Sequence, residues 1–584
     1  MKYVFLFKRS ILSTLIVVLL LSEIGLNING EQIYGNIIYV PDDYSTIQEA
    51  IDHANPGDTI IVRDGIYIEN IKINKSKITI KSENGFISTT IQSANPENYI
   101  LNVTRDYVRI EGFTVEGAAP HLYSPAGVFL SRVTHCEILS NKICDNHDGI
   151  HLYYSSDNIL TNNTVNDNYF GLHLVDSPDN VLSNNTVKNN EEAGFRLEYS
   201  SNNILIGNIV DNSYYGFYLC FSSNETLFNF NIIKNNAYGI CSYTSSNTIT
   251  NNLISNNYEG VYLRASSNNV LRNNTVNNNG EGIYLSSSNN ILANNTVSNS
   301  RYYGIILRGF SSNNIIIGNI VNNSLFGFSL KYSRNNTLVS NTINNNRFGI
   351  SIDRSSNSIL AKNAINNNTY AGIILYETSG NLISDNKINN NNNYGIRLTY
   401  SPNNNLTRNT ISNNVCGLYL GLQSLNNIIY LNNFINTENV VYEDHYFNNW
   451  NSTFKISYRY KLRRYTNYLG NYWSNYTGMD NNRDGIGDTP FVINDDNIDY
   501  YPLMKPYRAY SKTKLNPIFV KYRLIKTCYT HHLLILVMQI TKTMQKYYQP
   551  LTWISVIHPS KNSLHLRNHY SFGVKLLTDI RMYH

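Results

Sequence analysis

A glycine-marked repeat of about 22 residues is the feature that most constrains the fold of this chain. Nearly every glycine is followed by two apolar residues flanking a variable one, as in Ile150-His151-Leu152; Gly239, followed by Ile240-Cys241-Ser242, is the exception. A fixed period this short is typical of a solenoid, in which each repeat contacts only its neighbours. Fourteen glycines recur at intervals of 21 to 23 residues: Gly127, Gly149, Gly171, Gly194, Gly216, Gly239, Gly260, Gly282, Gly304, Gly327, Gly349, Gly372, Gly395 and Gly417.

The spacing of the apolar residues predicts which kind of solenoid forms. Alternation after each glycine indicates a strand with one buried face. Three further buried positions follow in each repeat, exemplified by Leu160, Asn163 and Val165. Three short strands leave no room for the apolar helix that leucine-rich or helical repeats require. We therefore predict an all-β parallel β-helix with about 22 residues and three strands per coil, and coils stacked about 4.8 Å apart.

The recurrent asparagines fit this architecture. Copies on successive coils are expected to form ladders in which each side-chain amide bonds the copies above and below it. A prion-like disordered segment is the alternative, but it would not keep Ile, Leu and Val in register. The repeat glycine is expected where the chain bends tightly into the next strand.

The N-terminal 120 residues divide into a leader and a cap. Lys2 and the apolar run 11–21 predict a signal peptide over residues 1–30, because the run is too short to span a bilayer stably; an uncleaved anchor is the alternative. Residues 31–120 are predicted to form an N-terminal cap and the first irregular coils. Residues 45–48 resemble a capping box, and the apolar face that follows would cover the first coil: Ile47, Ala50, Ile51 and Ala54.

Regular repeats are predicted over residues 121–440, followed by a C-terminal cap over residues 441–506. This cap contains an Asp-rich loop with oxygen side chains at positions 1, 3, 5 and 9 of an EF-hand-like loop and glycine at position 6. Position 12 is Phe491, so another acid such as Asp495 or Asp496 would have to complete the site. The sequence predicts calcium here, with an ordinary Asp/Asn turn as the alternative. The predicted ligands are Asp480, Asn482, Asp484 and Asp488.

A basic tail, predicted over residues 507–584, follows the cap. From Lys505 onward the chain holds 13 of its 46 Lys and Arg but only Asp579 of its 41 acids. The overall charge of +5 therefore describes neither part, and it does not indicate a nucleic-acid partner. A disordered extension and an out-of-frame artefact are both consistent with this composition, so we assign the tail no function.

Three segments carry a resemblance to known families. Val40–Ile51 resembles the N-terminal cap of pectin-lyase-like β-helix proteins, and Asp148–Ser155 with its repeats resembles the NosD family, which shares the carbohydrate-binding and sugar-hydrolysis repeat. Gly470–Leu503 is similar to the C-terminal segment common in archaeal cell-surface proteins of this type. The resemblance covers residues 37 to 505 and implies a right-handed, secreted or cell-surface β-helix. Because such repeats occur in enzymes, copper-maturation factors and surface proteins alike, it leaves the activity open.

The second residue after each repeat glycine is expected to point outward, and its copies form what we call the outer ladder. Aromatic members suit sugar rings, whose apolar faces stack on aromatic side chains. The alternative is that tyrosine simply suits a half-buried strand. We predict a secreted or extracellular cell-surface protein that binds polysaccharide or surface glycan. The residues predicted to bind it are Phe129, Arg196, Tyr218, Tyr262 and Tyr284.

A polysaccharide-modifying enzyme, of lyase, hydrolase or uronan-epimerase type, is the second hypothesis. His151 and His173 share a ladder position, so their side chains are expected about 5 Å apart. Carboxylates beside His and Arg would suit proton abstraction next to a uronate carboxyl, or acid–base cleavage of a glycosidic bond. The alternative is a solvated charged face, and the sequence does not decide whether the protein is an enzyme. The candidate catalytic residues are Asp148, His151, His173, Asp176, Arg196 and Glu198.

A structural envelope protein and a NosD-like copper-maturation factor are the remaining hypotheses. Copper(I) prefers thiolate, thioether and imidazole ligands. No methionine occurs between Met1 and Met479, and only His147, His151 and His173 are expected to cluster, so copper is disfavoured. We predict no transmembrane helix in the mature chain; the sequence does not indicate the oligomeric state.

Overall fold

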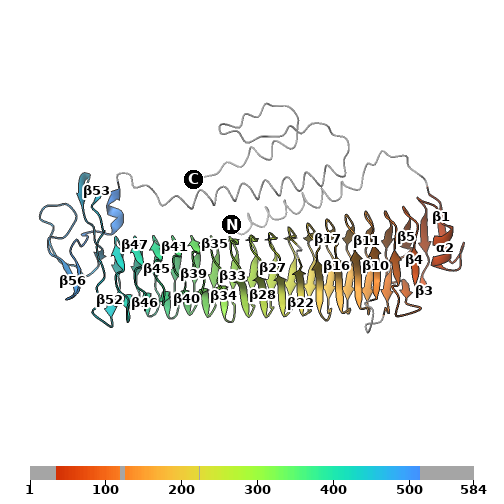
Figure 1. The fold of residues 1–584 in the computed structure, drawn as a ribbon, viewed down its shortest axis with the longest axis horizontal. Helices are drawn as coiled ribbons and strands as arrows, with labels where there is room; N and C mark the ends of the chain where they lie inside the picture. The colour runs from red at the N-terminus through yellow and green to blue at the C-terminus, as the bar shows by residue number, and fades with distance from the viewer. Residues whose placement is uncertain (1–34, 119–124, 222–223, 513–584) are drawn as a thin grey trace, which may run out of the picture. The chain divides into compact units, whose positions relative to one another are not determined.

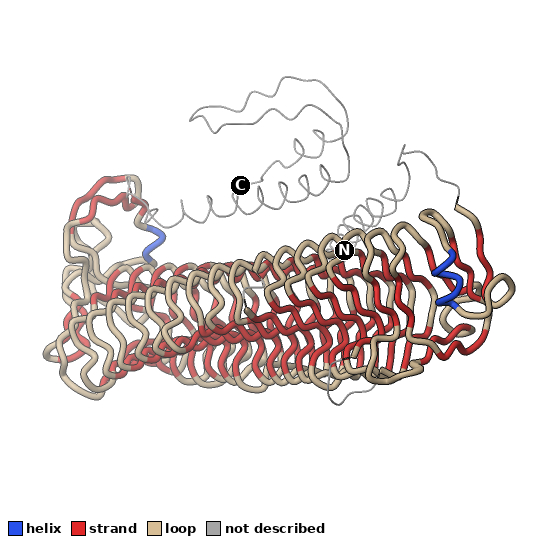
Figure 2. The backbone as a smooth tube through the Cα atoms, turned by 45° about the vertical axis from the view of Figure 1, so that its right-hand side comes forward, coloured by secondary structure: helices blue, strands red, loops and turns tan. Residues whose placement is uncertain are grey.

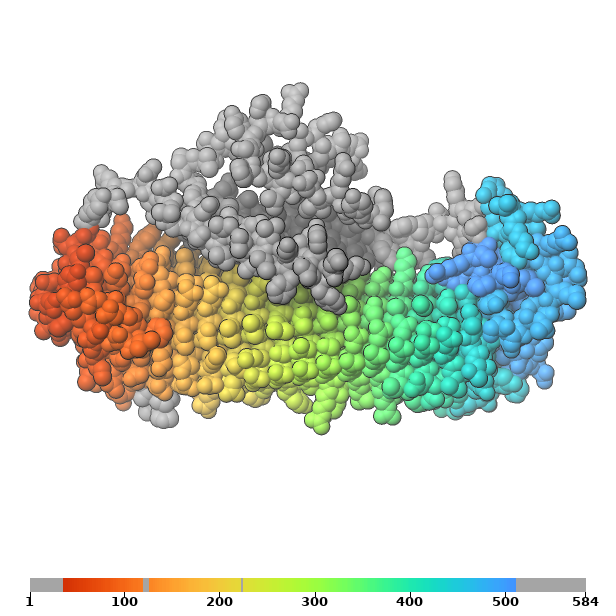
Figure 3. All heavy atoms as spheres, turned by 180° about the vertical axis from the view of Figure 1, so that it is seen from behind, coloured from red at the N-terminus to blue at the C-terminus, as the bar shows by residue number. Residues whose placement is uncertain are grey.

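The computed structural model describes residues 35–118, 125–221 and 224–512. The predicted signal peptide and the tail beyond residue 512 lie outside the described residues. Within them, coil after coil stacks along one axis, each contributing a strand to each of three parallel sheets, which we call A, B and C (Figure 1). Successive coils run in chain order from the N-terminal cap to the C-terminal cap, as the colour bands of Figure 3 show.

One coil illustrates all of them. β13 (Asp148–Tyr153) belongs to sheet C, β14 (Ile159–Thr161) to sheet A and β15 (Thr164–Asn166) to sheet B, and the chain then enters β16 (Phe170–Val175) directly beside β13. The pairing is parallel and in register, with His151 opposite His173. Three strands per coil of about 22 residues are confirmed. Sheet A runs from β1 (Ile37–Val40) to β50 (Ile428–Tyr430), and sheet B from β3 (Gly65–Ile68) to β55 (Tyr472–Trp473).

Sheet C carries the outer ladder. From β10 onward most of its strands are six residues long, against three in the regular coils of sheets A and B. Its strands are β4 (Ile71–Ile73), β7 (Leu101–Val103), β10 (Ala126–Ser131), β13, β16, β19 (Ala193–Glu198), β22 (Tyr215–Cys220), β25 (Tyr238–Ser242), β28 (Glu259–Arg264), β31 (Glu281–Ser286), β34 (Tyr303–Arg308), β37 (Phe326–Lys331), β40 (Phe348–Asp353), β43 (Ala371–Tyr376), β46 (Tyr394–Thr399), β49 (Cys416–Leu420) and β52 (Glu438–Tyr442).

The interior is a single apolar column closed by asparagine ladders. Leu160 and Val165 are fully buried, as predicted. The Asn163 amide donates to Asn185 Oδ1 at 3.1 Å, and the same oxygen accepts the Asn163 backbone N–H at 3.0 Å. Repetition of this pattern satisfies buried polar groups at the coil corners, so the predicted ladders are confirmed.

The repeat glycine is required by close packing. A Cβ on Gly149 would lie 2.5 Å from Val165 Cγ1 and 2.6 Å from the Gly171 carbonyl oxygen, which excludes any side chain. The chain bends here, and Ile150 faces the core while the Asp148 and His151 side chains meet on the outer surface. The bend therefore places two side chains of each coil on the same outer face.

Caps close both ends. Helix α2 (Ile47–His53) buries Ile47, Ala50 and Ile51 against the first coil. The expected capping box is wrong by one residue: Thr46, not Ser45, is the N-cap, and its hydroxyl accepts the Glu49 N–H at 3.1 Å. The Ser45 hydroxyl is drawn away because it bonds the Glu49 carboxylate instead.

The C-terminal cap contains two antiparallel pairs. β53 (Ile456–Tyr460) pairs with β54 (Arg463–Asn467) and with β58 (Ser511–Lys512), and β56 (Phe491–Asn494) pairs with β57 (Asn497–Asp499). A short 3-10 helix, η1 (Tyr507–Ala509), leads to Tyr510, which is buried against Tyr458 and Tyr460. The cap thus continues beyond residue 506, and within the described residues helix is confined to α2 and η1 (Figure 2).

Candidate functional site

The outer face of β13, β16 and β19 brings most of the candidate catalytic residues together. Asp148, at the bend of its coil, is fully buried. Its Oδ2 lies 3.0 Å from His151 Nδ1 and 3.0 Å from His173 Nδ1. The two imidazoles stack with ring centroids 4.6 Å apart, close to the expected separation. We call Asp148, His147, His151 and His173 the histidine cluster.

Two further contacts complete the histidine cluster. His147, considered from the sequence only as a copper ligand, bonds Asp148 Oδ1 through Nδ1 at 2.7 Å. The His173 contact with Oδ2 has hydrogen-bond geometry, whereas His151 Nδ1 is buried and makes no hydrogen bond. The Nε2 atoms of His151 and His173 are also buried without a partner.

Burial and neighbouring groups shift the pKa values of Asp148 and His173 in the histidine cluster. Burial alone would raise the pKa of Asp148, but contacts from His147, His151 and His173 outweigh it and hold the pKa well below its usual range. Burial lowers the pKa of His173, against the opposing effect of Asp148. The arrangement therefore favours an ionised carboxylate beneath a neutral imidazole.

Arg196 and Glu198 form the next layer on β19. They are ion-paired with each other, and Glu198 Oε1 lies 3.9 Å from His173 Nε2. The Arg196 guanidinium also lies 4.8 Å from the centroid of the Phe170 ring. Asp176, the remaining candidate, does not join the cluster; it lies at the turn after β16, near Tyr154.

The outer-ladder aromatics are half-buried because they pack on one another. Tyr262 and Tyr284 lie 4.9 Å apart between ring centroids, and Tyr218 stacks on Tyr215 at 4.6 Å. Burial raises the pKa of Tyr218 to about 12. Phe129 is covered by Tyr99, which stacks on it at 4.0 Å. Much of the ring surface of this ladder is therefore occupied by neighbouring rings, and glycan binding there stays a prediction.

A second set of side chains, not recognised from the sequence, is more exposed. The fifth residue after the repeat glycine turns the chain out of sheet C with positive φ in eleven coils. Tyr154, Tyr199 and Phe221 at this turn are each about half exposed. We call these eleven positions the outer corner: Arg132, Tyr154, Asp176, Tyr199, Phe221, Ala265, Gly309, Tyr332, Arg354, Glu377 and Tyr400.

Neighbouring coils pair their outer-corner side chains. Tyr199 and Phe221 stack at 5.2 Å. The Arg354 guanidinium lies 5.4 Å from the Tyr332 ring centroid and bonds the Tyr332 hydroxyl at 2.7 Å. It also pairs with Glu377 at 2.5 Å. The corner thus carries two runs of aromatic and charged side chains, one from Arg132 to Phe221 and one from Tyr332 to Tyr400.

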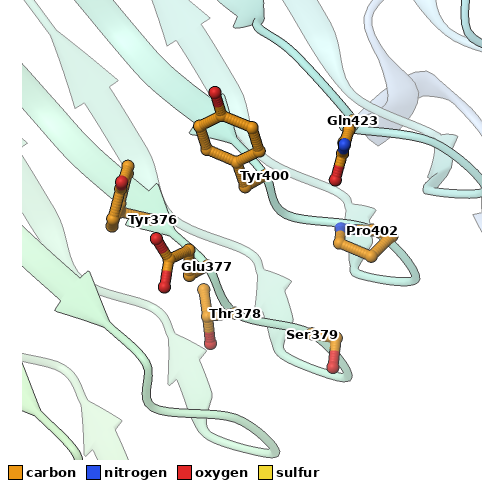
Figure 4. Close-up of a pocket in the computed structure, with 7 residues that line it drawn as sticks. All are labelled: Tyr376, Glu377, Thr378, Ser379, Tyr400, Pro402 and Gln423. Carbon is orange, nitrogen blue, oxygen red and sulfur yellow. The ribbon is translucent and has the colours of Figure 1, made fainter.

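One open groove lies at this corner near the C-terminal end of the repeats (Figure 4). It has a volume of about 580 Å³. The Tyr376 and Tyr400 rings stand edge to face, 5.9 Å apart, with the Glu377 carboxylate beside Tyr376. The lining residues are Tyr376, Glu377, Thr378, Ser379, Tyr400, Pro402 and Gln423.

A local signal in the sequence marks the outer corner. In eight of the eleven coils the corner residue immediately precedes a Ser, as in Tyr154-Ser155, Tyr199-Ser200 and Arg354-Ser355. That Ser is buried, so the residue before it must point outward. An aromatic residue at this offset could therefore have been read as exposed.

The Asp-rich loop makes internal hydrogen bonds. Asp480 accepts the N–H groups of Asp484 and Gly485 at 3.0 Å each, and Asp488 accepts that of Asn481 at 2.8 Å. Asn482 Oδ1 accepts the Asp484 N–H at 2.9 Å. These bonds are compatible with either an Asp/Asn turn or a cation loop, so calcium stays a prediction.

Among the described cysteines only Cys144 lies in a group of potential metal ligands, with Glu116 and Asp145. All five described cysteines are buried and free, and burial raises the pKa of each to about 12: Cys136, Cys144, Cys220, Cys241 and Cys416. A thiol with such a pKa is not a thiolate ligand at neutral pH. That copper is not a ligand of this protein therefore stays a prediction, and the raised thiol pKa values agree with it.

The coil geometry, the asparagine ladders and the capping helix define a parallel β-helix, and two family profiles match parts of the chain. The profile described as "Right handed beta helix region" matches residues 99–254. The profile described as "Periplasmic copper-binding protein (NosD)" matches residues 231–355 and 309–478. The resemblance noted in the sequence is thus confirmed.

A curated relative is a cell surface glycoprotein of Methanothermus fervidus, 38% identical over 102 residues. The match covers 17% of this chain and 16% of that protein, so the chain spans only a small part of its length. No helix among the described residues is long and apolar enough to cross a membrane.

Solved structures similar to the chain include two enzymes that act on uronans. The A-module of the mannuronan C-5 epimerase AlgE4 of Azotobacter vinelandii is 14% identical, with 64% of this chain and 92% of that chain covered and a TM-score of 0.26. A mannuronic acid specific polysaccharide family 6 lyase from human gut microbiota is 14% identical, with 54% and 83% covered and a TM-score of 0.35. At TM-scores below 0.5 these likenesses carry no statement about substrate or activity.

Proposed function

We propose that this protein acts at the cell surface and binds polysaccharide or surface glycan along the outer corner. The predicted signal peptide and the relationship to an archaeal cell surface glycoprotein support the location. The binding surface is inferred from the chain's own geometry.

The observation that carries the proposal is the choice of residues at the outer corner. A left-handed conformation costs a residue with a side chain about 1–2 kcal/mol, and a bulky side chain there is an outlier. The corresponding turn after sheet B uses asparagine in nearly every coil from Asn189 to Asn413, which lowers this cost. At the outer corner asparagine is absent and Tyr154, Tyr199 and Tyr332 occupy the strained position. A side chain retained at such a cost, and exposed, points to a role outside folding.

The chemistry of the outer corner suits sugars. Exposed aromatic faces accept the apolar faces of pyranose rings, while carboxylate, guanidinium and amide groups bond the hydroxyls. The groove at Tyr376 and Tyr400 combines these elements with Glu377 and Gln423. Because the corner extends over successive coils, a polymer that contacts several coils at once gains affinity over a monosaccharide.

Affinity electrophoresis of the purified protein through gels containing a panel of polysaccharides tests this proposal. Tyr376→Ala with Tyr400→Ala should reduce the retardation seen with the wild type. Tyr262→Ala with Tyr284→Ala is the matched control, because it removes two tyrosines from the half-buried outer ladder. Loss of retardation in the ladder variant alone would show that the outer ladder, not the outer corner, is the binding surface. Retardation equal to that of the wild type in both variants would refute binding through either surface.

The enzyme hypothesis is favoured by one observation, the meeting of Asp148, His173 and Glu198 on one face. The same geometry limits it, because the Asp148 carboxylate is fully buried and the His173 Nε2 atom is buried as well. A sugar would have to displace the surrounding side chains to reach them. New reducing ends or unsaturated uronates released from the same panel, and lost in His151→Ala with His173→Ala, would establish the enzyme instead.

A further inference from the structure

We propose that Asp148, His151 and His173 bind one divalent metal ion of the zinc class, between two neighbouring coils. The site lies outside residues 231–478, to which the copper-binding family profile matches. The proposal rests on three observations: three ligand atoms converge, a buried histidine nitrogen lacks a hydrogen bond, and the Asp148 carboxyl is buried. It is independent of the glycan-binding proposal.

Convergence is produced by the repeat itself. One ligand atom from each of the three residues lies within 4.8 Å of the other two. Asp148 Oδ2 is 3.0 Å from both Nδ1 atoms. Zinc bonds of about 2.0–2.1 Å in a tetrahedral site place ligand atoms roughly 3.3 Å apart, so each carboxylate–imidazole distance needs to open by only a few tenths of an ångström.

One unsatisfied atom lies where a metal would bind. His151 Nδ1 is buried, faces Asp148 Oδ2, and makes no hydrogen bond. Buried polar atoms are normally paired, and leaving one unpaired costs about 1–3 kcal/mol. A cation held between Nδ1 and the carboxylate would satisfy this nitrogen.

The surroundings resemble an outer shell for a metal. His147 holds Asp148 Oδ1 at 2.7 Å, which leaves Oδ2 free for the metal. Glu198 Oε1, 3.9 Å from His173 Nε2, is placed to accept the N–H that a metal-bound imidazole presents there. Phe129 and Phe170 are buried beside the imidazoles and limit access of water.

Charge and donor type select the metal. The Asp148 carboxyl is fully buried, and its Oδ2 offers one oxygen donor beside two imidazole nitrogens at 3.0 Å. Two imidazoles and one carboxylate match the borderline divalent ions, whereas calcium prefers six to eight oxygen atoms and copper(I) prefers sulfur. Zinc, which has no redox chemistry, is the appropriate probe.

The test uses the full chain after treatment with a chelator, titrated with zinc sulfate by calorimetry, with bound metal counted after desalting. His151→Phe with His173→Phe keeps two stacked rings and removes both nitrogen ligands. Asp148→Asn removes the carboxylate charge, and His445→Ala, an exposed histidine of the C-terminal cap, is the control. Six histidines lie beyond residue 505, so each variant is compared with the wild type rather than with zero.

We expect the double variant to lose one zinc equivalent per chain, and its affinity at this site to fall by more than the roughly 10–100-fold that loss of an outer-shell partner costs. His445→Ala should bind as the wild type does. Cobalt(II) should give absorption bands in the wild type that the double variant lacks. Asp148→Asn replaces a single carboxylate atom and is the variant least disruptive to folding. If it binds zinc with the stoichiometry, affinity and cobalt spectrum of the wild type, the carboxylate is not a ligand and the proposal is overturned.

Discussion

At the residue scale, position within the coil decides what a side chain does. Inward positions after the glycine hold apolar residues in the regular coils with one exception, Ser242, whereas outward positions vary from His151 to Tyr284. The bend at the glycine adds a second outward position, which holds Asp148, Glu259 and Glu281 among others. Predictions for single residues follow from this division.

Val276→Asp should destabilise the protein severely. Val276 is fully buried in sheet B, and an unpaired carboxylate there costs about 3–5 kcal/mol. Tyr284→Ala, which removes one half-buried ring contact, should cost about 1 kcal/mol. Urea unfolding followed by circular dichroism measures both. Equal losses in the two variants would contradict the assignment of inward and outward positions.

Stability should fall as pH rises from about 4.5 to about 7. Burial, with a smaller contribution from Glu281, raises the pKa of Glu259 from 4.5 to about 7, and the pKa of Glu281 is also raised by burial. A raised carboxyl pKa means that the folded state binds the proton more tightly than the unfolded state, so the stabilisation is complete below 4.5 and is lost as pH passes the folded pKa.

Melting temperatures measured between pH 4.5 and pH 7.5 check this pH dependence. Glu259→Gln should flatten the decline, because glutamine does not titrate. Glu97→Gln, at an exposed acid, should leave the slope unchanged. A wild-type melting temperature that rises over this interval would show that other groups dominate.

At the element scale, the caps differ from the coils because they have only one neighbouring coil each. α2 covers the first coil with Ile47, Ala50 and Ile51, and Trp450 and Trp473 are buried at the other end. The Asp-rich loop lies in this C-terminal cap, where Ile486 packs with Leu503 and Tyr510. Binding of a cation to this loop would therefore affect the stability of the cap.

Calcium should stabilise the C-terminal cap if the loop binds it. Burial raises the pKa of Asp484, and the nearby charges of Asp480 and Asp488 raise it further, so a cation would relieve their repulsion. Calcium added to chelator-treated protein should raise the melting temperature, and Asp484→Ala should remove that increase. Magnesium serves as the control ion. Melting curves that superimpose with and without calcium would leave the loop as an Asp/Asn turn.

At the scale of the whole molecule, stacking converts a short repeat into long surfaces. Each coil contributes one outer-ladder and one corner side chain, so function can be distributed along the chain, as the outer corner is, or confined to two coils, as the histidine cluster is. The two proposals can fail separately, because the Tyr376–Tyr400 groove and the histidine cluster involve different coils.

Much of the fold was predictable from the sequence because the same residue pattern recurs at fourteen glycines. The glycine, the apolar pair and the asparagine recur with one period, so the strands, their register and the buried positions Leu160, Asn163 and Val165 followed from local pattern. The shared ladder position of His151 and His173 followed as well. Signals repeated in every coil override the ambiguity of any single short strand.

Only the tertiary structure decided how outward side chains at different positions relative to the repeat glycine meet. The bend at Gly149 turns Asp148 under the two imidazoles and buries it, while the Arg196–Glu198 pair forms beside them and Asp176 is carried away to the corner. Exposure was likewise decided by neighbours: Tyr262 is half covered by Tyr284, whereas Tyr154 stays about half exposed at its turn. The period determines which residues lie side by side on adjacent coils, and the repeat glycine marks where the chain bends. Which side chains meet across that bend depends on the backbone path within a coil, which the repeat pattern does not specify.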